Sequence, residues 1–298
     1  MIQTKYFFIG KSTFSFLIIL FCASASFSET QKENSVLKNI NVLPEYYFEQ
    51  DARWFANHKN EQFEKAYLLE GTTRFEAMFV SYADKFFLGG FYLNNLGMGK
   101  QHKDIVFDPR DVHYALSPFF EIRHKGFHYQ LGLDHRCFHE VDRNTRSTPY
   151  WNQLFVSAAS ENYRRRFFIR RLEENGTWGY PDRFTWNAYF GYFITEFFGS
   201  VNPKILSGGH NWRTVSRVET DYAFYRTESW IFNAGHELQL FSDTAGTCYW
   251  SGKLSLKADL YRYKHGISFF MNYNYEFPSE KPIYSKDQLL ELGIKFHY

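Results

Sequence analysis

Histidine, cysteine and asparagine residues with the chemistry of a nucleophilic site occur close together in one region of the sequence. His135 and Cys137 are one residue apart, and they continue a series of apolar residues at the alternate positions 127, 129, 131 and 133. Alternate residues of a β-strand point to the same side, so the two reactive groups would lie in line with an apolar row. Asn152 stands in phase with the apolar residues of the next alternating run, 154, 156 and 158. If the two runs pair, an imidazole, a thiol and a carboxamide come together, which is the composition of a Cys-His-Asn nucleophilic site.

The same residues permit two other interpretations. His135, Cys137, His139 and Asp142 could chelate a metal ion, because alternate residues of one strand share a face and a thiolate with imidazoles suits zinc or copper. Cys137 could instead form a disulfide with Cys248, the other cysteine of the predicted mature chain, in an oxidising compartment. A disulfide would rule out both the nucleophilic and the metal-binding interpretation.

The N-terminus has the features of an export signal. Two lysines, Lys5 and Lys11, precede an apolar run at 14–21, and small residues follow at 23–25. This order predicts a signal peptide over residues 1–28, with cleavage after Ala25 or Ser28. The apolar run is shorter than the roughly 20 residues of a membrane-spanning helix, and no later stretch is long enough either. We therefore expect an exported chain that does not cross a membrane with helices.

The composition combines a high aromatic content with a low mean hydropathy. Aromatic residues make up 21% of the chain, although its mean hydropathy of -0.45 is that of a water-soluble protein. A β-barrel in a bacterial outer membrane explains both values, because its outer face is apolar with aromatic girdles while its lumen is polar. The charge balance of 34 basic and 32 acidic residues gives no indication of a nucleic-acid partner.

The last residues show the alternation that such a barrel requires. Apolar residues occupy the even positions from 290 to 298, and Glu291, Gly293, Lys295 and His297 lie between them. This ending, with the aromatic Tyr298 last, resembles the C-terminal signal that barrel-assembly machinery reads in outer-membrane proteins of Gram-negative bacteria. We predict an all-β fold, an antiparallel transmembrane barrel of about 12 strands (range 10–14) over residues 71–298. Residues 29–70 are expected to form an irregular or helical periplasmic segment, with a helix-favouring patch at 49–60.

The predicted strands do not give a consistent topology. They lie at 72–82, 86–95, 112–123, 127–138, 151–160, 164–171, 183–194, 215–225, 230–241, 250–260, 267–277 and 290–298. Short turns of bacterial barrels face the periplasm, as do both termini. Counting back from the C-terminus places the turns at 226–228 and 264–266 on the periplasmic side. Counting forward places those at 83–85 and 124–126 on the opposite side, so a strand is missing or one is superfluous.

The candidate site also matches a known family locally. Leu131-Gly132-Leu133-Asp134-His135-Arg136-Cys137, followed by Trp151-Asn152-Gln153-Leu154-Phe155, resembles the active-site region of outer-membrane phospholipase A, and the His-x-Cys pattern is similar to that of lipid A deacylases. The resemblance implies a 12-stranded barrel with a site on its lipid-exposed face. His135 would be the general base, Cys137 would take the place of the nucleophilic serine, and Asn152 would orient His135. The family's Asn-Gly-Arg after the serine is absent here, and the loop to Asn152 is longer.

The resemblance also bears on partners and cofactors. It implies a homodimer and calcium, for which Ser147 and Asp142 are the only candidate ligands in this region. The barrel would contact outer-membrane lipids and lipopolysaccharide. The arginines at 164–166 and 170–171 could bind their phosphates, or could instead line the lumen or anchor the barrel at the membrane interface. The alternative function is a porin-like channel or a structural barrel, with a wet lumen lined by Lys253, Lys257, Asp259, Glu291 and Lys295.

Overall fold

Twelve antiparallel β-strands form a single closed barrel. The structure, a computed structural model, describes residues 39–57, 68–99, 109–140, 150–161, 163, 183–194, 212–262, 265–275 and 289–297. The strands are β1 (Ile40–Asn57), β2 (Leu69–Tyr82), β3 (Phe86–Met98), β4 (Pro109–His124), β5 (Phe127–Glu140), β6 (Tyr150–Ser160), β7 (Phe184–Phe193), β8 (Trp212–Arg226), β9 (Trp230–Asp243), β10 (Cys248–Arg262), β11 (His265–Tyr275) and β12 (Leu289–His297).

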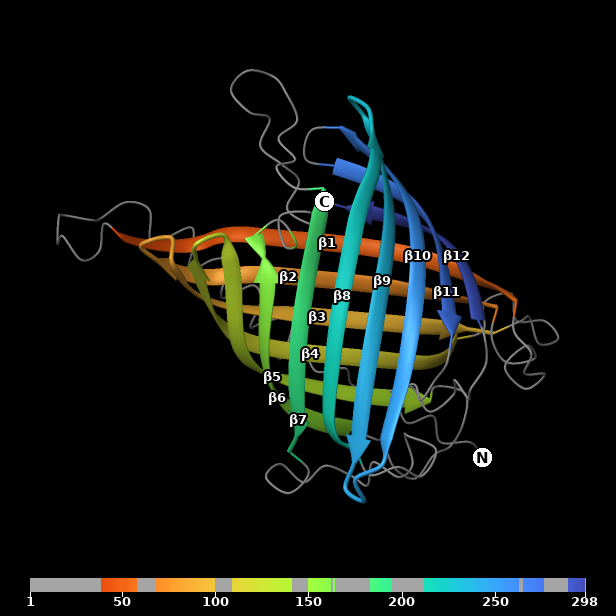
Figure 1. Ribbon diagram of the computed structural model, residues 1–298, viewed down its shortest axis with the longest axis horizontal. Coiled ribbons are helices and arrows are strands. Elements are labelled where there is room, and N and C mark those ends of the chain that lie inside the picture. Colours follow the sequence, from red (N-terminus) through yellow and green to blue (C-terminus); the bar gives the residue numbers. More distant parts are fainter. Residues whose placement is uncertain are drawn as a thin grey trace, which may run out of the picture.

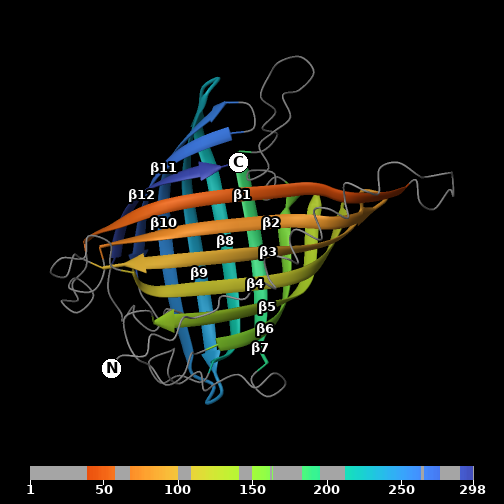
Figure 2. The same ribbon diagram turned by 180° about the vertical axis from the view of Figure 1, so that it is seen from behind.

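Each strand pairs with its neighbours in sequence, and β1 pairs with β12 to close the barrel. Strands β7 to β10 form the wall nearest the viewer in Figure 1, and β1 to β4 form the wall nearest the viewer in Figure 2. The two walls cross at a steep angle in both views because barrel strands are tilted against the barrel axis. Among the described residues, no helix has the length and apolar character needed to cross a bilayer.

The predicted all-β barrel and its count of about 12 strands are confirmed, but one strand was assigned wrongly. Residues 40–57, which were expected to lie in the periplasmic segment, form β1. The alternation in β1 is obscured because its lumen-facing side carries the apolar Tyr47 and Phe55 as well as acids. Helix-favouring Glu49 is buried on that same side. The predicted signal peptide, residues 1–28, lies outside the described residues.

The missing strand also resolves the topological conflict. The predicted strand at 164–171 lies outside the described residues, and β6 pairs directly with β7. With β1 in place, the connections at 83–85, 125–126 and 227–229 all lie at the end of the barrel where β1 begins and β12 ends. The connections at 58–68, 99–108 and 141–149 lie at the opposite end. Since short turns face the periplasm in bacterial barrels, this opposite end has the character of the extracellular side.

The outer face is apolar, as the alternation predicts. Exposed side chains at alternate positions include Leu131 on β5, Leu154 and Val156 on β6, and Leu254 and Leu256 on β10. Their neighbours in sequence, such as Gln130 and Ser255, are buried in the lumen. The outer surface is thus suited to hydrocarbon and the interior to polar groups.

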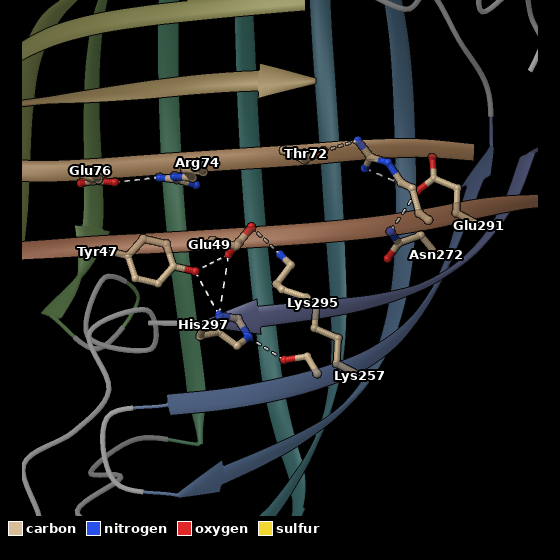
Figure 3. Close-up of polar contacts among 12 residues, drawn as sticks. Tyr47, Glu49, Thr72, Arg74, Glu76, Lys257, Asn272, Glu291, Lys295 and His297 are labelled. Atoms are coloured by element: carbon tan, nitrogen blue, oxygen red, sulfur yellow. Dashed lines mark hydrogen bonds and ion pairs between the residues drawn. The ribbon is translucent and has the colours of Figure 1, made fainter. Parts of the chain in front are cut away.

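The lumen contains a network of paired charges. Figure 3 shows Glu49 between three partners: Lys295 Nζ lies 2.8 Å from its carboxylate, Tyr47 donates a hydrogen bond to it, and His297 Nδ1 is 3.8 Å away. His297 also contacts Ser268 Oγ on β11 at 2.6 Å, so it links β1 and β11, the two neighbours of β12. Such networks allow charges to be buried because each is compensated by a partner.

Two aromatic clusters pack inside the same lumen. One cluster draws on six consecutive strands, β5 to β10, and the other on β2, β3, β4 and β6. The first consists of Phe138, Trp151, Phe193, Trp212, Val215 and Phe241, with Tyr189 and Tyr249 against it; the second consists of Met78, Phe87, Phe119 and Phe155. A cavity of about 410 Å³ remains among the polar residues.

Candidate functional site on the outer face

The pairing of β5 with β6 brings two of the predicted site residues together. His135 stands directly opposite Asn152, and Cys137 stands opposite Tyr150. His135 and Cys137 follow Leu131 and Leu133 on the outward face of β5, and Asn152 precedes Leu154 on the outward face of β6. The three residues therefore share the outer face, at the end of the barrel opposite the short turns at 83–85, 125–126 and 227–229.

His135 and Asn152 are joined by a hydrogen bond. Nδ1 of His135 lies 2.8 Å from Oδ1 of Asn152, and the asparagine side chain is only 5% exposed although it lies on the outer face. A carboxamide oxygen can only accept, so this contact places the proton of the imidazole on Nδ1. Nε2 is then left without a proton and can act as an acceptor, which is the tautomer that a general base needs.

Cys137 lies beside His135 but is not bonded to it. The two side chains point the same way because they are two positions apart on one strand. Within the described part of the chain, no hydrogen bond joins the imidazole to the thiol. Contacts between a nucleophile and its base are often long in a site without substrate and shorten when the substrate binds. The arrangement supplies the components of the site with the imidazole already oriented.

Aromatic residues that the sequence did not single out surround this group. Tyr150 lies beside His135, with ring centroids 6.1 Å apart, and Tyr114 packs edge-on against His139 at 5.7 Å. Tyr114 is also the residue directly opposite Cys137 on β4. Only the pairing of β4 with β5 identifies it, because it lies more than twenty residues away in the sequence.

Residues on the lumen-facing side of β5 make contacts that stabilise the strand behind the site. Asp134 accepts hydrogen bonds from Ser117 Oγ at 2.6 Å and from Arg136 Nε at 2.8 Å. At Gly132 a Cβ atom would come within 2.7 Å of the Phe155 ring, so this ring packs directly on the β5 backbone there. This packing fixes the strand that carries His135 and Cys137.

The metal-binding alternative finds no support in the described residues. Within those ranges, no group of three or more histidine, cysteine, aspartate and glutamate residues is placed to hold a metal ion, so His135, Cys137 and His139 do not form such a group. Asp142 and Ser147 lie outside the described residues.

The disulfide alternative is not realised. Cys137 and Cys248 are both free thiols, Cys137 partly buried and Cys248 exposed. The nucleophilic interpretation of Cys137 is thus not blocked by a covalent bond to the other cysteine.

The residues predicted to line a channel do face the lumen, but they are paired. Lys295 contacts Glu49 at 2.8 Å, Lys257 contacts Asp221 at 2.9 Å, and Lys253 forms an ion pair with Glu237. Asp259 accepts a hydrogen bond from Asn233 at 2.6 Å, and Glu291 accepts one from Asn272 at 3.0 Å. Figure 3 shows the Asn272–Glu291 contact beside the Glu49 cluster.

Comparison with known proteins shows similarity of structure and none of sequence. No protein-family model matches the chain, and no curated protein matches it. Among solved structures, the outer membrane phospholipase A of Escherichia coli is similar with a TM-score of 0.52 and 12% identity, over 84% of this chain and 91% of that one. The Salmonella typhi outer membrane phospholipase, a dimer with bound calcium, has a TM-score of 0.50 and 12% identity, over 90% and 94% of the two chains.

A third structure, an asparagine-to-alanine active-site mutant of the E. coli enzyme, has a TM-score of 0.50 and 10% identity, over 92% of this chain and 95% of that one. The chain has the fold of outer membrane phospholipase A. At these identities the likeness is one of fold, and it supports a place for the chain among outer-membrane β-barrels of bacteria. What those enzymes do is considered for this chain below.

Proposed function

We propose that this barrel is a lipid acyl hydrolase of the outer membrane, in which Cys137 is the nucleophile, His135 the general base and Asn152 the residue that orients His135. The observation that carries the proposal is the 2.8 Å hydrogen bond between His135 Nδ1 and Asn152 Oδ1 on the lipid-facing side of the barrel, next to a free thiol. A polar pair on this face is costly in hydrocarbon, and polar groups inside membranes mark functional sites.

The reaction follows from the chemistry of the three side chains. His135 Nε2 accepts the thiol proton of Cys137, and the thiolate attacks the carbonyl carbon of an ester bond. The tetrahedral intermediate collapses to a thioester on Cys137, and the leaving alcohol takes the proton from the His135 imidazolium. Water, deprotonated by His135, then hydrolyses the thioester and releases the fatty acid. The Asn152 oxygen stabilises the imidazolium in both steps because its hydrogen bond strengthens when His135 becomes charged.

The location and the structural relatives support a lipid substrate. The site lies on the outer face near the end opposite the short turns, which is the extracellular end in bacterial outer-membrane barrels. Lipids and lipopolysaccharide would reach it laterally. The similar structures include a phospholipase and an active-site variant of it in which an asparagine was replaced, which fits the role given to Asn152. Export by a signal peptide, assembly through the last strand and a homodimer, as in the Salmonella enzyme, complete the proposal.

The channel alternative has less support. An open channel needs a continuous water-filled path, whereas this lumen holds paired charges and an aromatic cluster contributed by six consecutive strands. The lysines expected to line a pore are each paired with an acid on the adjacent strand or, for Lys257, one strand further along the wall.

The experiment is a hydrolysis assay with a cysteine control. Purified protein in mixed micelles of detergent and diacyl phospholipid should release fatty acid, and Cys137→Ala should abolish the release. Cys248→Ala, the matched change at the other free cysteine, should leave the rate unchanged. Equal rates for the unmodified protein and Cys137→Ala, or no release from any ester lipid by the unmodified protein, would overturn the proposal.

A further inference from the structure

Four polar residues form a continuous row on the outer face that ends at Cys137. Gln50 on β1 pairs with Thr73 on β2, Thr73 with Asn94 on β3, Asn94 with Tyr114 on β4, and Tyr114 with Cys137 on β5. Residues directly opposite each other in antiparallel strands point to the same side of the sheet. We call these four side chains, Gln50, Thr73, Asn94 and Tyr114, the outer polar row.

The outer polar row lies between apolar residues and descends into the membrane. The next outward-facing residues include Leu96 on one side of the row and Leu116 on the other, where Leu116 is 57% exposed. Strands are about 4.8 Å apart, so the four steps from Cys137 to Gln50 span about 19 Å. Barrel strands are tilted by about 40°, so the line from Cys137 to Gln50, which runs at right angles to the strands, is inclined to the membrane plane by the same angle. The depths of its two ends in the membrane therefore differ by about 12 Å. Cys137 lies near the end of β5 at Glu140, whereas Gln50 lies midway along β1, so the Gln50 end is the deep one.

The side chains of the outer polar row have no hydrogen-bond partners among the described residues. In the described ranges, no side-chain hydrogen bond is made by any of its four members. The Oδ1 atom of Asn94 is buried and has no partner there. Unsatisfied amide and hydroxyl groups are costly in an apolar environment, by roughly 2–7 kcal/mol each relative to water. A partner that supplies hydrogen bonds from within the hydrocarbon would remove this cost.

The chemistry of the row limits what that partner can be. None of the four side chains is charged, so the row is not built for a phosphate or another ionic headgroup. It offers two amides and two hydroxyls, which both donate and accept hydrogen bonds. These suit neutral polar groups, and the row starts at the proposed nucleophile, where the acyl chain of a bound ester begins. Tyr114 on β4 lies directly opposite Cys137 on β5.

We propose that the outer polar row receives an acyl chain that carries a hydroxyl group partway along its length, so that the site selects ester lipids with hydroxylated chains over those with plain hydrocarbon chains. The inference rests on the proposed function, since it names the substrate class of that site. Asn94 lies two strands, or about 10 Å, from Cys137, and Thr73 lies three strands away. A hydroxyl group in the middle of a chain esterified at the site therefore reaches Asn94 or Thr73.

The test is a binding competition with a hydrolysis assay beside it. The full chain carrying Cys137→Ala is equilibrated with equal amounts of two phosphocholine lipids, one with plain chains and one with a mid-chain hydroxyl on each chain. Native mass spectrometry gives the ratio of the two bound lipids. We expect about fivefold more of the hydroxylated lipid, which corresponds to one hydrogen bond of about 1 kcal/mol. Asn94→Leu and Thr73→Val, added singly, should bring the ratio towards one.

Thr220→Val is the matched control, because Thr220 on β8 pairs with His236 on β9 and lies three strands from Cys137 on β5. It should keep the fivefold preference. Equal binding of both lipids, or a preference that survives Asn94→Leu and Thr73→Val together, would overturn the proposal. So would a dimer without lipid preference that these two changes dissociate, because a second copy of the chain would then cover the row. Fatty-acid release by the unmodified protein tests the proposed function separately, since the binding ratio does not depend on turnover.

Discussion

Replacing Asn152 by alanine tests the orientation of the general base. The change removes the acceptor 2.8 Å from His135 Nδ1 and leaves Cys137 and His135 in place. A hydrogen bond to a charged group contributes about 1.5–3 kcal/mol, and His135 carries a charge only after it has taken the thiol proton. The loss should therefore fall on the transition state, which lowers kcat by about 10- to 150-fold, while KM changes little.

The assay is fatty-acid release from mixed micelles over a range of lipid concentrations. Asn152→Asp keeps an acceptor in the same place and should lose less activity than Asn152→Ala. Asn41→Ala is the matched control, since Asn41 is an exposed asparagine that bonds Asp84 at the other end of the barrel, and it should behave like the unmodified protein. A folded barrel gives a heat-dependent shift on a denaturing gel, which should be the same for all variants. If Asn152→Ala kept full kcat while Cys137→Ala were inactive, the role given to Asn152 would be refuted.

Three further predictions concern the barrel that holds the site. Gly132→Val should impair folding, because a Cβ at this position already comes within 2.7 Å of the Phe155 ring; the folded fraction on an unheated gel measures this. Glu49→Gln should lower the free energy of unfolding by about 3–5 kcal/mol, because it leaves Lys295 without its buried counter-charge; urea unfolding in lipid vesicles measures this, and an unchanged midpoint would contradict it. The unmodified protein in a planar bilayer should show no stepwise conductance, because aromatic rings from six consecutive strands cluster in its lumen; steps of porin size would favour the channel alternative.

The regular part of the barrel was predictable because its two environments differ so strongly. The alternation in 290–298 and 250–260 separates side chains that face hydrocarbon from those that face the lumen, and both segments are strands. β1 was missed because Tyr47 and Phe55 are apolar residues inside the lumen, and because its acids read as helix-favouring. The local sequence predicts that Glu49 lies in a solvated segment. Its charge is instead compensated in the lumen by Lys295 on β12, which is more than two hundred residues away.

The candidate site was predictable in part for the same reason. The phase of His135 and of Asn152 placed both on the outer face, and the pairing of β5 with β6 sets them opposite each other. The register between strands depends on where each loop ends, and no local pattern contains it. Tyr114 and Asn94 therefore became visible as neighbours of Cys137 only through the pairing of β3, β4 and β5.

The proposed hydrolysis requires a covalent bond between Cys137 and an acyl group. Purified protein is mixed with a diacyl ester lipid, quenched in acid within the first turnover and digested, and the peptide that contains Cys137 is weighed. We predict an added mass of one acyl chain on Cys137 that hydroxylamine removes, with no such adduct in His135→Ala. Fatty-acid release without any acyl group on Cys137, or an equal yield of adduct on Cys248, would contradict the account.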